Sequence, residues 1–405
     1  MQKLLQKPSL WLIILIVALP QLSETIYTPS LPDIAHALSV SDNMVEYTLT
    51  IYLFGFAVGV LFWGNLSDRI GRRPALLMGL VIYLLGCIGC WYSANITMLM
   101  LSRFIQAFGG STGSVLGQAI ARDAFPGPER SKVFSTIGIA LACAPALGPI
   151  IGGFTDQYFG WSAVFLVLIA LGLYVTRQVF ATLPETNMNL RTTKGHLINN
   201  FTKVLTDKHV LSMGFFVSAC NGIIFSLYSE GPFYMIEMLG LTPSQYGCIY
   251  LFIAAATIAG GMFSRYLNIR HHPGEKIILK GILITFAGTI TLTIFAYTGY
   301  IQKDYGLFSV GLTLGLLVIT LFGVTAIIPN SLSHALESYK HMAGTAASLF
   351  GFYYYVLISA MTFIMGFIHD GTVIPMPLYF SGLALSMLFV YVVGVRKASH
   401  PTIPA

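Results

Sequence analysis

The feature that most constrains this chain is a series of apolar runs, each about 20 residues long, that recurs along most of its length. A helix needs about 20 mainly apolar residues to cross the hydrocarbon core of a bilayer. Of the 405 residues, 55% are hydrophobic and 9% are charged, whereas soluble domains carry about 25% charged residues. The runs also lack the strict alternation of membrane-barrel strands. We therefore expect an all-α integral membrane protein.

Twelve of these runs are long enough to span a bilayer. They lie at about 9–31, 44–66, 74–93, 98–120, 133–154, 161–181, 210–235, 245–267, 276–299, 306–328, 343–367 and 376–395. The longest polar stretch separates the sixth run from the seventh. The sequence therefore predicts two six-helix halves, at residues 1–182 and 210–405, joined by a cytoplasmic linker at 183–209.

Short echoes between the halves support an internal repeat, which many transporters contain. Ser23-Glu24 in the first run recurs as Ser229-Glu230 in the seventh, each followed closely by proline. Gly64–Arg69 after the second run has a degraded copy, Gly261–Tyr266, after the eighth.

The positions of the basic residues predict the orientation in the membrane. With the N-terminus inside, the 22 Lys and Arg fall in cytoplasmic segments except Lys303, which lies outside, and Arg103, which lies within a run. This is the positive-inside bias, and it predicts that both termini are cytoplasmic. It also accounts for the net charge of +6, so we expect the partner to be a lipid bilayer rather than nucleic acid.

Cysteine and histidine suggest no metal site. Cys87 and Cys90 form a CxxC pair inside the third run, without aqueous access, and His271-His272 sits in a basic loop without companion ligands. We expect neither a metal nor another cofactor.

The loop after the second run has a distinctive composition, Gly64-Asn65-Leu66-Ser67-Asp68-Arg69-Ile70-Gly71-Arg72-Arg73-Pro74. Gly71 permits a tight reversal between two long helices, and Asp68 can pair with an arginine. Arg72 and Arg73 hold the loop on the cytoplasmic side. A simple positive-inside anchor would need the basic residues, but not an acid and two glycines at this spacing.

This loop resembles the signature of the major facilitator superfamily, G-x-L-a-D-r-x-G-r-r. In that family the loop is a cytoplasmic latch between two six-helix halves. The resemblance implies the major facilitator fold with twelve transmembrane helices. It also implies gating roles for Gly64, Asp68, Arg69, Gly71, Arg72 and Arg73, and for Arg122 and Asp123, which resemble the family's partner segment after the fourth helix.

The fifth run contains Pro145, Gly148, Pro149, Gly152 and Gly153. Prolines four residues apart bend a helix, and glycines let a neighbouring backbone approach closely. A close-packed interface would use the same residues. The pattern also resembles the antiporter motif of drug-exporting superfamily members, which implies a hinge and seal in these five residues and favours export.

Further matches narrow the resemblance to the bicyclomycin and chloramphenicol resistance type of twelve-span drug:proton antiporters. They include Arg103–Gln106, Leu183–Thr186 and Ala343–Ala346. The resemblance implies a monomer in a bacterial inner membrane. That branch usually has Asp where this chain has Thr25, and Glu24 lies one position earlier, a rotation of about 100° on a helix. Glu230 also stands where small neutral residues are more usual.

Ionisable groups inside a span are costly and usually mark an ion or substrate route. Glu24, Glu230 and Arg103 are therefore the predicted proton-coupling residues. The alternatives are a structural acid at Glu24 and an interhelical hydrogen-bond anchor at Arg103.

Aromatic side chains can line a cavity for planar or cationic ligands. The predicted substrate-binding residues are Tyr27, Tyr52, Gln106, Tyr228, Tyr234 and Tyr354. The tyrosines also fit interfacial belts.

The sequence thus predicts a proton-coupled secondary transporter that exports small amphipathic compounds by alternating access. The alternative is a proton-coupled transporter of one metabolite, such as a siderophore or an amino acid, working as exporter or importer. An enzyme or a channel would need a catalytic set or a continuous polar stripe inside the spans, and we find neither in the sequence.

Overall fold

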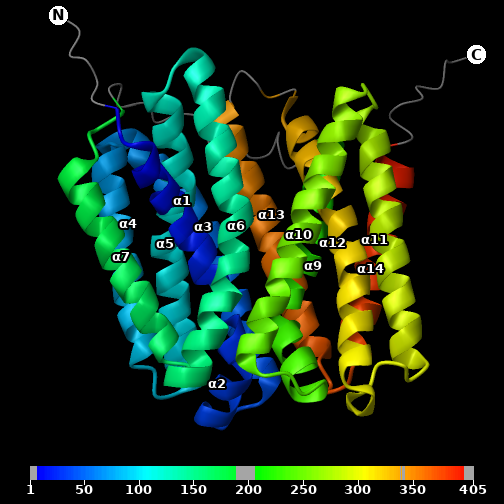
Figure 1. Cartoon of the computed structure of the whole chain (residues 1–405). Coiled ribbons are helices and arrows are strands. Elements are labelled where there is room, and N and C mark those ends of the chain that lie inside the picture. Colours follow the sequence, from blue (N-terminus) through cyan, green and yellow to red (C-terminus); the bar gives the residue numbers. More distant parts are fainter. Residues whose placement is uncertain (1–6, 188–205, 338, 340–342, 396–405) are drawn as a thin grey trace, which may run out of the picture. The chain divides into compact units, whose positions relative to one another are not determined.

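The computed structural model describes residues 7–187, 206–337, 339 and 343–395, and this part of the chain folds into helices and connecting turns. Eleven segments among them are long and apolar enough to cross a membrane. The helix α5 (Ile96–Ala124) is not among the eleven. Its 29 residues are enough to cross a membrane, but Arg103, Gln106 and many small residues lower its hydropathy. With α5 the set matches the predicted twelve spans, which confirms the predicted all-α membrane fold (Figure 1).

The chain divides into two compact units. Unit 1 comprises Met1–Gly195 with Thr242–Cys248, and unit 2 comprises His196–Leu241 with Ile249–Ala405. Residues 188–205 of the predicted linker lie outside the described part of the chain.

The described part of unit 1 contains seven α-helices, one 3₁₀ turn and the beginning of an eighth helix, α10. These are α1 (Leu10–Thr25), η1 (Thr28–Ser30), α2 (Leu31–Leu38), α3 (Asp42–Ile70), α4 (Arg72–Trp91), α5 (Ile96–Ala124), α6 (Gly127–Phe159), α7 (Ala163–Thr182) and α10 (Pro243–Ile269).

The described part of unit 2 contains the rest of α10 and eight further elements, two of them π-helical. These are α9 (Lys208–Pro232), η2 (Phe233–Met238), α11 (Gly274–Tyr297), η3 (Lys303–Tyr305), α12 (Leu307–Ala335), α13 (Ala343–Ile368), α14 (Pro375–Val390) and η5 (Tyr391–Val395).

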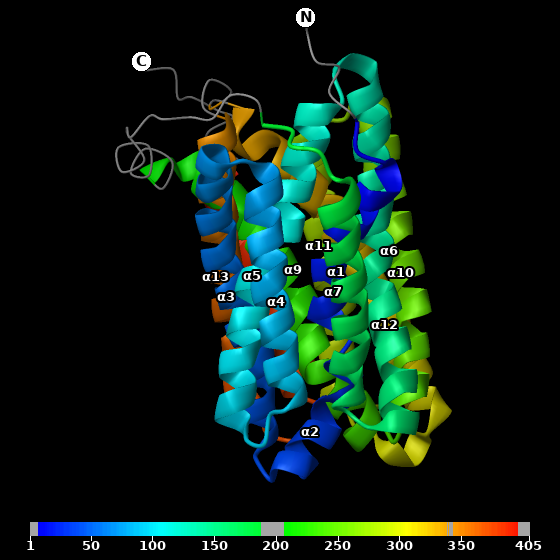
Figure 2. The same cartoon turned by 90° about the vertical axis from the view of Figure 1, so that its left-hand side faces the viewer.

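Small residues hold the helices of unit 1 close together, as is usual in membranes. Helix α5 packs on both α3 and α4, as Figure 2 shows. A Cβ added to Gly86 of α4 would lie 2.3 Å from the backbone nitrogen of Gln106, and one added to Gly109 would lie 2.3 Å from that of Tyr83. These contacts bring the polar side chains of α5 within reach of the neighbouring helices.

Both predicted acids lie just before a break in a helix. The first span is not one continuous helix: α1 ends at Thr25, one residue after Glu24, and the chain continues through a 3₁₀ turn that contains Pro29. In unit 2, α9 ends at Pro232, two residues after Glu230, and continues as a π-helix. Proline removes a helical hydrogen bond, and π-turns occur often at functional sites.

Candidate coupling and gating sites

A buried arginine organises the interior of unit 1. The guanidinium carbon of Arg103 lies 3.8 Å from the ring centroid of Tyr27 and 4.1 Å from that of Tyr52. Both tyrosines are fully buried, so the cation is held between two aromatic faces, an arrangement that stabilises a desolvated charge. Arg103 Nη1 also donates to Gln106 Oε1 at 2.6 Å and to the Ser23 carbonyl at 3.4 Å.

Glu24 lies near this arginine. Its residue is 1% exposed, and its carboxyl group is attracted electrostatically by Arg103. Glu24 Oε1 has no hydrogen-bond partner within the described residues. A buried carboxylate that lacks hydrogen bonds depends on a nearby opposite charge to remain ionised.

The structure thus brings together five of the residues predicted from the sequence, Glu24, Tyr27, Tyr52, Arg103 and Gln106. They come from the α1–η1 segment, α3 and α5. We call them the Arg103 cluster. In this state the faces of the two tyrosines are occupied by the guanidinium, so their role in binding substrate stays a prediction.

The cluster continues through hydrogen bonds to α4. Gln106 Nε2 donates to Cys87 Sγ at 3.0 Å, and the hydroxyls of Ser23 and Tyr83 lie 2.7 Å apart. Cys87 therefore helps to orient Gln106, which itself orients Arg103.

The glycine face of α6 packs directly beside Glu24. A Cβ on Gly148 would lie 2.0 Å from Thr25 Oγ1, and one on Gly152 would lie 1.6 Å from the Ile26 carbonyl oxygen. Gly153 faces the start of α10, where a Cβ would lie 2.2 Å from the Pro243 carbonyl oxygen. Pro145 and Pro149 lie inside the same helix. These glycines let α1 approach α6 at the two residues that follow the acid.

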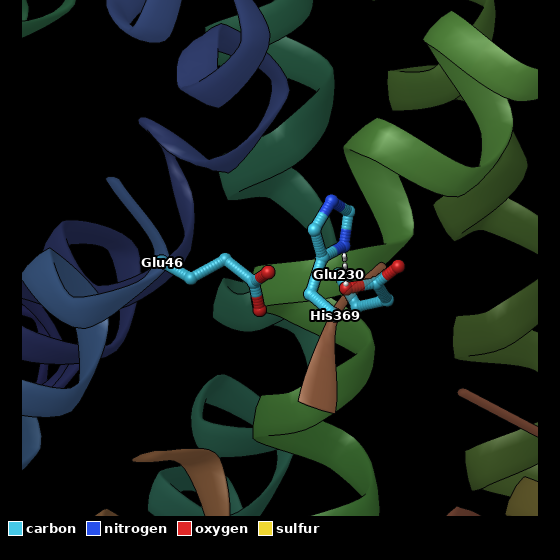
Figure 3. A group of neighbouring side chains, drawn as sticks. All are labelled: Glu46, Glu230 and His369. Atoms are coloured by element: carbon cyan, nitrogen blue, oxygen red, sulfur yellow. Dashed lines mark hydrogen bonds and ion pairs between the residues drawn. The ribbon is translucent and has the colours of Figure 1, made fainter. Parts of the chain in front are cut away.

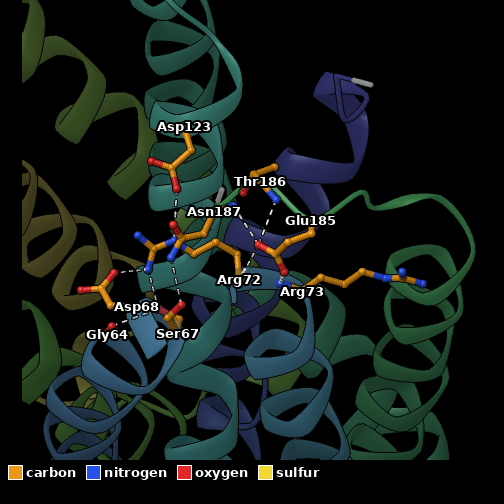
Figure 4. Close-up of polar contacts among 9 residues, drawn as sticks. All are labelled: Gly64, Ser67, Asp68, Arg72, Arg73, Asp123, Glu185, Thr186 and Asn187. Atoms are coloured by element: carbon orange, nitrogen blue, oxygen red, sulfur yellow. Dashed lines mark hydrogen bonds and ion pairs between the residues drawn. The ribbon is translucent and has the colours of Figure 1, made fainter. Parts of the chain in front are cut away.

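Arg72 ties together the predicted gating loop (Figure 4). Its guanidinium pairs with Asp68 at 2.7 Å and with Asp123 of α5 at 3.1 Å, and it donates to Ser67 Oγ at 2.6 Å. Ser67 Oγ in turn donates to the Gly64 carbonyl at 3.0 Å. Arg72, Asp68 and Asp123 therefore form one charge network that connects the end of α3, the start of α4 and the end of α5.

The remaining basic residues of the loop have other surroundings. Arg73 donates to the Phe180 carbonyl at 2.8 Å, whereas Arg69 and Arg122 are exposed. The gating roles of Arg69, Arg73 and Arg122 stay predictions.

Glu185 lies just after α7, within the Leu183–Thr186 match, and its contact with the gating loop was not predicted from the sequence. Its carboxylate accepts from the backbone N–H groups of Arg72 at 2.9 Å and Arg73 at 3.0 Å, which begin α4 (Figure 4). An anion at a helix N-terminus satisfies donors that have no intrahelical partner. Gly71, at φ +101°, leaves room for it, because a Cβ there would lie 2.5 Å from Glu185 Oε2.

Replacing Glu185 by alanine should lower the thermal stability of the purified protein by about 1 kcal/mol, the usual effect of losing a helix cap. Thermal unfolding in detergent measures the change. Glu185→Gln, which retains a carbonyl acceptor, should lie between wild type and alanine. An alanine variant as stable as wild type would mean that this carboxylate does not hold the loop.

Unit 2 contains a buried acid–base pair (Figure 3). Glu230 Oε2 lies 2.8 Å from His369 Nδ1, and the two side chains are 0% and 4% exposed. Glu230 is on α9, and His369 directly follows α13. Nothing in the sequence links these residues, because they are 139 positions apart. The only available signal was a histidine at the very end of an apolar run.

The predicted aromatic residues of unit 2 do not form one cluster. Tyr228 stacks on Tyr250, with centroids 5.3 Å apart and planes 9° from parallel. Tyr354 contacts the rings of Phe350 and Tyr355. Tyr234 is buried in η2 and interacts electrostatically with Glu230. Their substrate contacts stay predictions.

Comparison with known proteins identifies relatives over almost the whole chain. Residues 13–362 match the family model of the Major Facilitator Superfamily. An uncharacterized transporter of Rickettsia bellii is 35% identical over 98% of this chain and 99% of its own. A bicyclomycin resistance protein homolog of Haemophilus influenzae is 31% identical over 82% of both chains.

Solved structures support the same fold. The xylose transporter XylE from E. coli, in a partially occluded inward open conformation, superposes with a TM-score of 0.71 at 14% identity over 97% of this chain and 99% of its own. The chain is therefore a multi-pass membrane transporter rather than an enzyme, and it belongs to the Major Facilitator Superfamily.

Proposed function

We propose that this protein is a proton-coupled antiporter that exports small amphipathic compounds by alternating access. The observation that carries the proposal is the Arg103 cluster, because it places an acid inside the membrane next to a permanent cation. Similarity to a bicyclomycin resistance protein homolog supports drug export.

The cluster supports both protonation states of Glu24. When Glu24 is ionised, its charge compensates Arg103, which stays protonated in proteins. When Glu24 is neutral, the faces of Tyr27 and Tyr52 and the carbonyl of Gln106 still stabilise the guanidinium. Neither state leaves the arginine without partners, so one proton can be gained and lost at Glu24 in each cycle.

We propose that the α6 glycines convert this charge change into movement. The backbone of residues 25 and 26 lies against Gly148 and Gly152, so a shift of the α1 segment that carries Glu24 must displace α6 or slide along it. In this proposal, Asp68, Arg72 and Asp123 form the cytoplasmic gate, and Glu185 holds it in place. Close packing of this kind permits discrete arrangements rather than continuous deformation.

The proposed setting is a bacterial inner membrane, with both termini in the cytoplasm and the protein as a monomer. Protons then enter from the outer face and leave to the cytoplasm, while the substrate moves in the opposite direction. A transporter of one specific metabolite is the second candidate. The observation that favours it is Glu24, which lies one position from the acid that the resistance branch usually has.

The test uses inside-out membrane vesicles that contain the protein and hold an acidic interior, with a fluorescent dye reporting the pH gradient. Chloramphenicol, bicyclomycin, ethidium and tetraphenylphosphonium are added in turn. We expect at least one to dissipate the gradient, and vesicles that lack the protein to give no response. A response to none of them, with a response to an amino acid or siderophore, would replace drug export with the second candidate. Substrate transport that ignores the gradient would contradict proton coupling.

A further inference from the structure

The Glu230–His369 pair is a second site at which unit 2 could carry a proton. Two ionisable groups, both almost completely buried, meet at 2.8 Å within a single unit. Burying such a pair is costly, and an apolar pair of similar volume would often be at least as stable. Ionisable residues that are nevertheless present in a membrane span usually serve a function. Packing alone therefore does not account for this pair.

The backbone on both sides holds the pair in position. His369 donates its backbone N–H to the Met365 carbonyl at 3.1 Å, which fixes it at the end of α13. On the other side, Pro232 and the π-helix Phe233–Met238 alter the end of α9 just beyond Glu230. The centroid of the Phe233 ring lies 5.6 Å from that of the imidazole, so an aromatic ring is adjacent to the pair.

The pair can bind one proton without losing its hydrogen bond. With Glu230 ionised and His369 neutral, Nδ1–H donates to the carboxylate and the pair carries one negative charge. One added proton gives either a carboxylate with an imidazolium or a carboxylic acid with a neutral imidazole, and both forms are uncharged overall. In the second form the carboxylic acid donates to Nδ1. A proton can therefore be gained or lost at the pair without breaking this hydrogen bond.

Other ionisable groups of unit 2 near the pair are few among the described residues. The Tyr234 phenol interacts electrostatically with Glu230. Asp370 follows His369 but is exposed, and its carboxylate accepts from the backbone N–H and the hydroxyl of Thr372 at 2.9 and 2.7 Å. Asp370 therefore provides a matched control, since it is an adjacent acid with partners of its own.

We propose that Glu230 and His369 together form a second proton-carrying site, which loads and releases one proton per transport cycle in addition to the proton at Glu24. The inference rests on the proposed proton-coupled function. It predicts that two protons are exchanged for each molecule of substrate, so that export of one molecule of a neutral compound moves two positive charges across the membrane rather than one.

The first experiment measures the proton-to-substrate ratio in proteoliposomes, from the membrane potential and pH difference at which net chloramphenicol flux is zero. We expect a ratio of two for wild type and for Asp370→Asn. Glu230→Gln and His369→Gln retain hydrogen-bonding side chains, and we expect both to transport with a ratio of one. An unchanged ratio in both variants, or a ratio of one in wild type, would overturn the proposal.

The second experiment does not depend on transport. Infrared difference spectra of the purified protein in lipid are recorded while the pH is changed. We expect a carboxyl or imidazole signal that disappears in Glu230→Gln, changes in His369→Gln and persists in Asp370→Asn. If this signal is present but no compound is transported, the proposed function fails rather than the site. If the signal is absent from wild type, the site itself is disproved.

Discussion

Glu24→Gln is expected to abolish the substrate-dependent collapse of a pH gradient in vesicles, with a loss of at least about 100-fold, the scale of removing an essential proton-transfer group. Glutamine has nearly the same shape but cannot take up a proton at physiological pH. In our proposal the charge change at Glu24 drives the movement of α1 against α6, so a proton at Glu230–His369 cannot complete the cycle alone. The Arg103 charge keeps its contacts with Tyr27 and Tyr52, so the variant should fold and reach the membrane.

The matched control for this variant is Asp33→Asn, which removes an exposed carboxylate from α2 in the same unit. We expect it to retain coupling. Binding of the same compound, measured by a change in intrinsic fluorescence, should persist in Glu24→Gln. Gradient collapse that survives in Glu24→Gln would show that protonation of Glu24 is not required for the transport cycle.

Gly152→Ala is expected to have the second largest effect. The added methyl group would lie 1.6 Å from the Ile26 carbonyl oxygen, which is backbone and cannot turn aside as a side chain does. Helices α1 and α6 must therefore separate. Overpacking of this kind costs about 1–3 kcal/mol, and it displaces the segment that carries Glu24. We expect a loss of transport of more than about tenfold, alongside a lower thermal stability.

Gly138→Ala provides the control on the same helix. A Cβ at Gly138 meets nothing within 4 Å, so this variant should transport and unfold like wild type. Both variants are compared by gradient collapse and by thermal unfolding in detergent. A fully active Gly152→Ala variant would mean that close contact between α1 and α6 is not needed for transport.

The fold was predictable because each apolar run is long enough to cross a bilayer and the basic residues fall on one side. Glu24, Arg103 and Asp68 could also be predicted from the sequence. A charged residue inside an apolar run, or an acid in a basic loop, can be recognised without knowledge of the structure. The break after Thr25 was not predicted, although Pro29 and Pro32 mark it. A single helix over 9–31 is therefore wrong, because Pro29 lies in a 3₁₀ turn that follows the end of α1 at Thr25.

Glu185 and His369 were missed for a different reason. Glu185 acts on backbone N–H groups more than 100 positions earlier in the chain, and backbone donors have no sequence signature. His369 meets Glu230 only because α9 and α13 pack together. Contacts of this kind depend on which helices pack against each other, and the pattern of hydrophobic residues does not predict this.

The contact between Thr25 and Gly148 couples substitutions at these two positions. The side chain at position 25 lies against the glycine face of α6, whereas Glu24 interacts with Arg103. A side chain larger than threonine at position 25 would press on α6, and a residue larger than glycine at position 148 would press on the Thr25 hydroxyl. We therefore expect a larger residue at one of these positions to be tolerated best when the other becomes smaller.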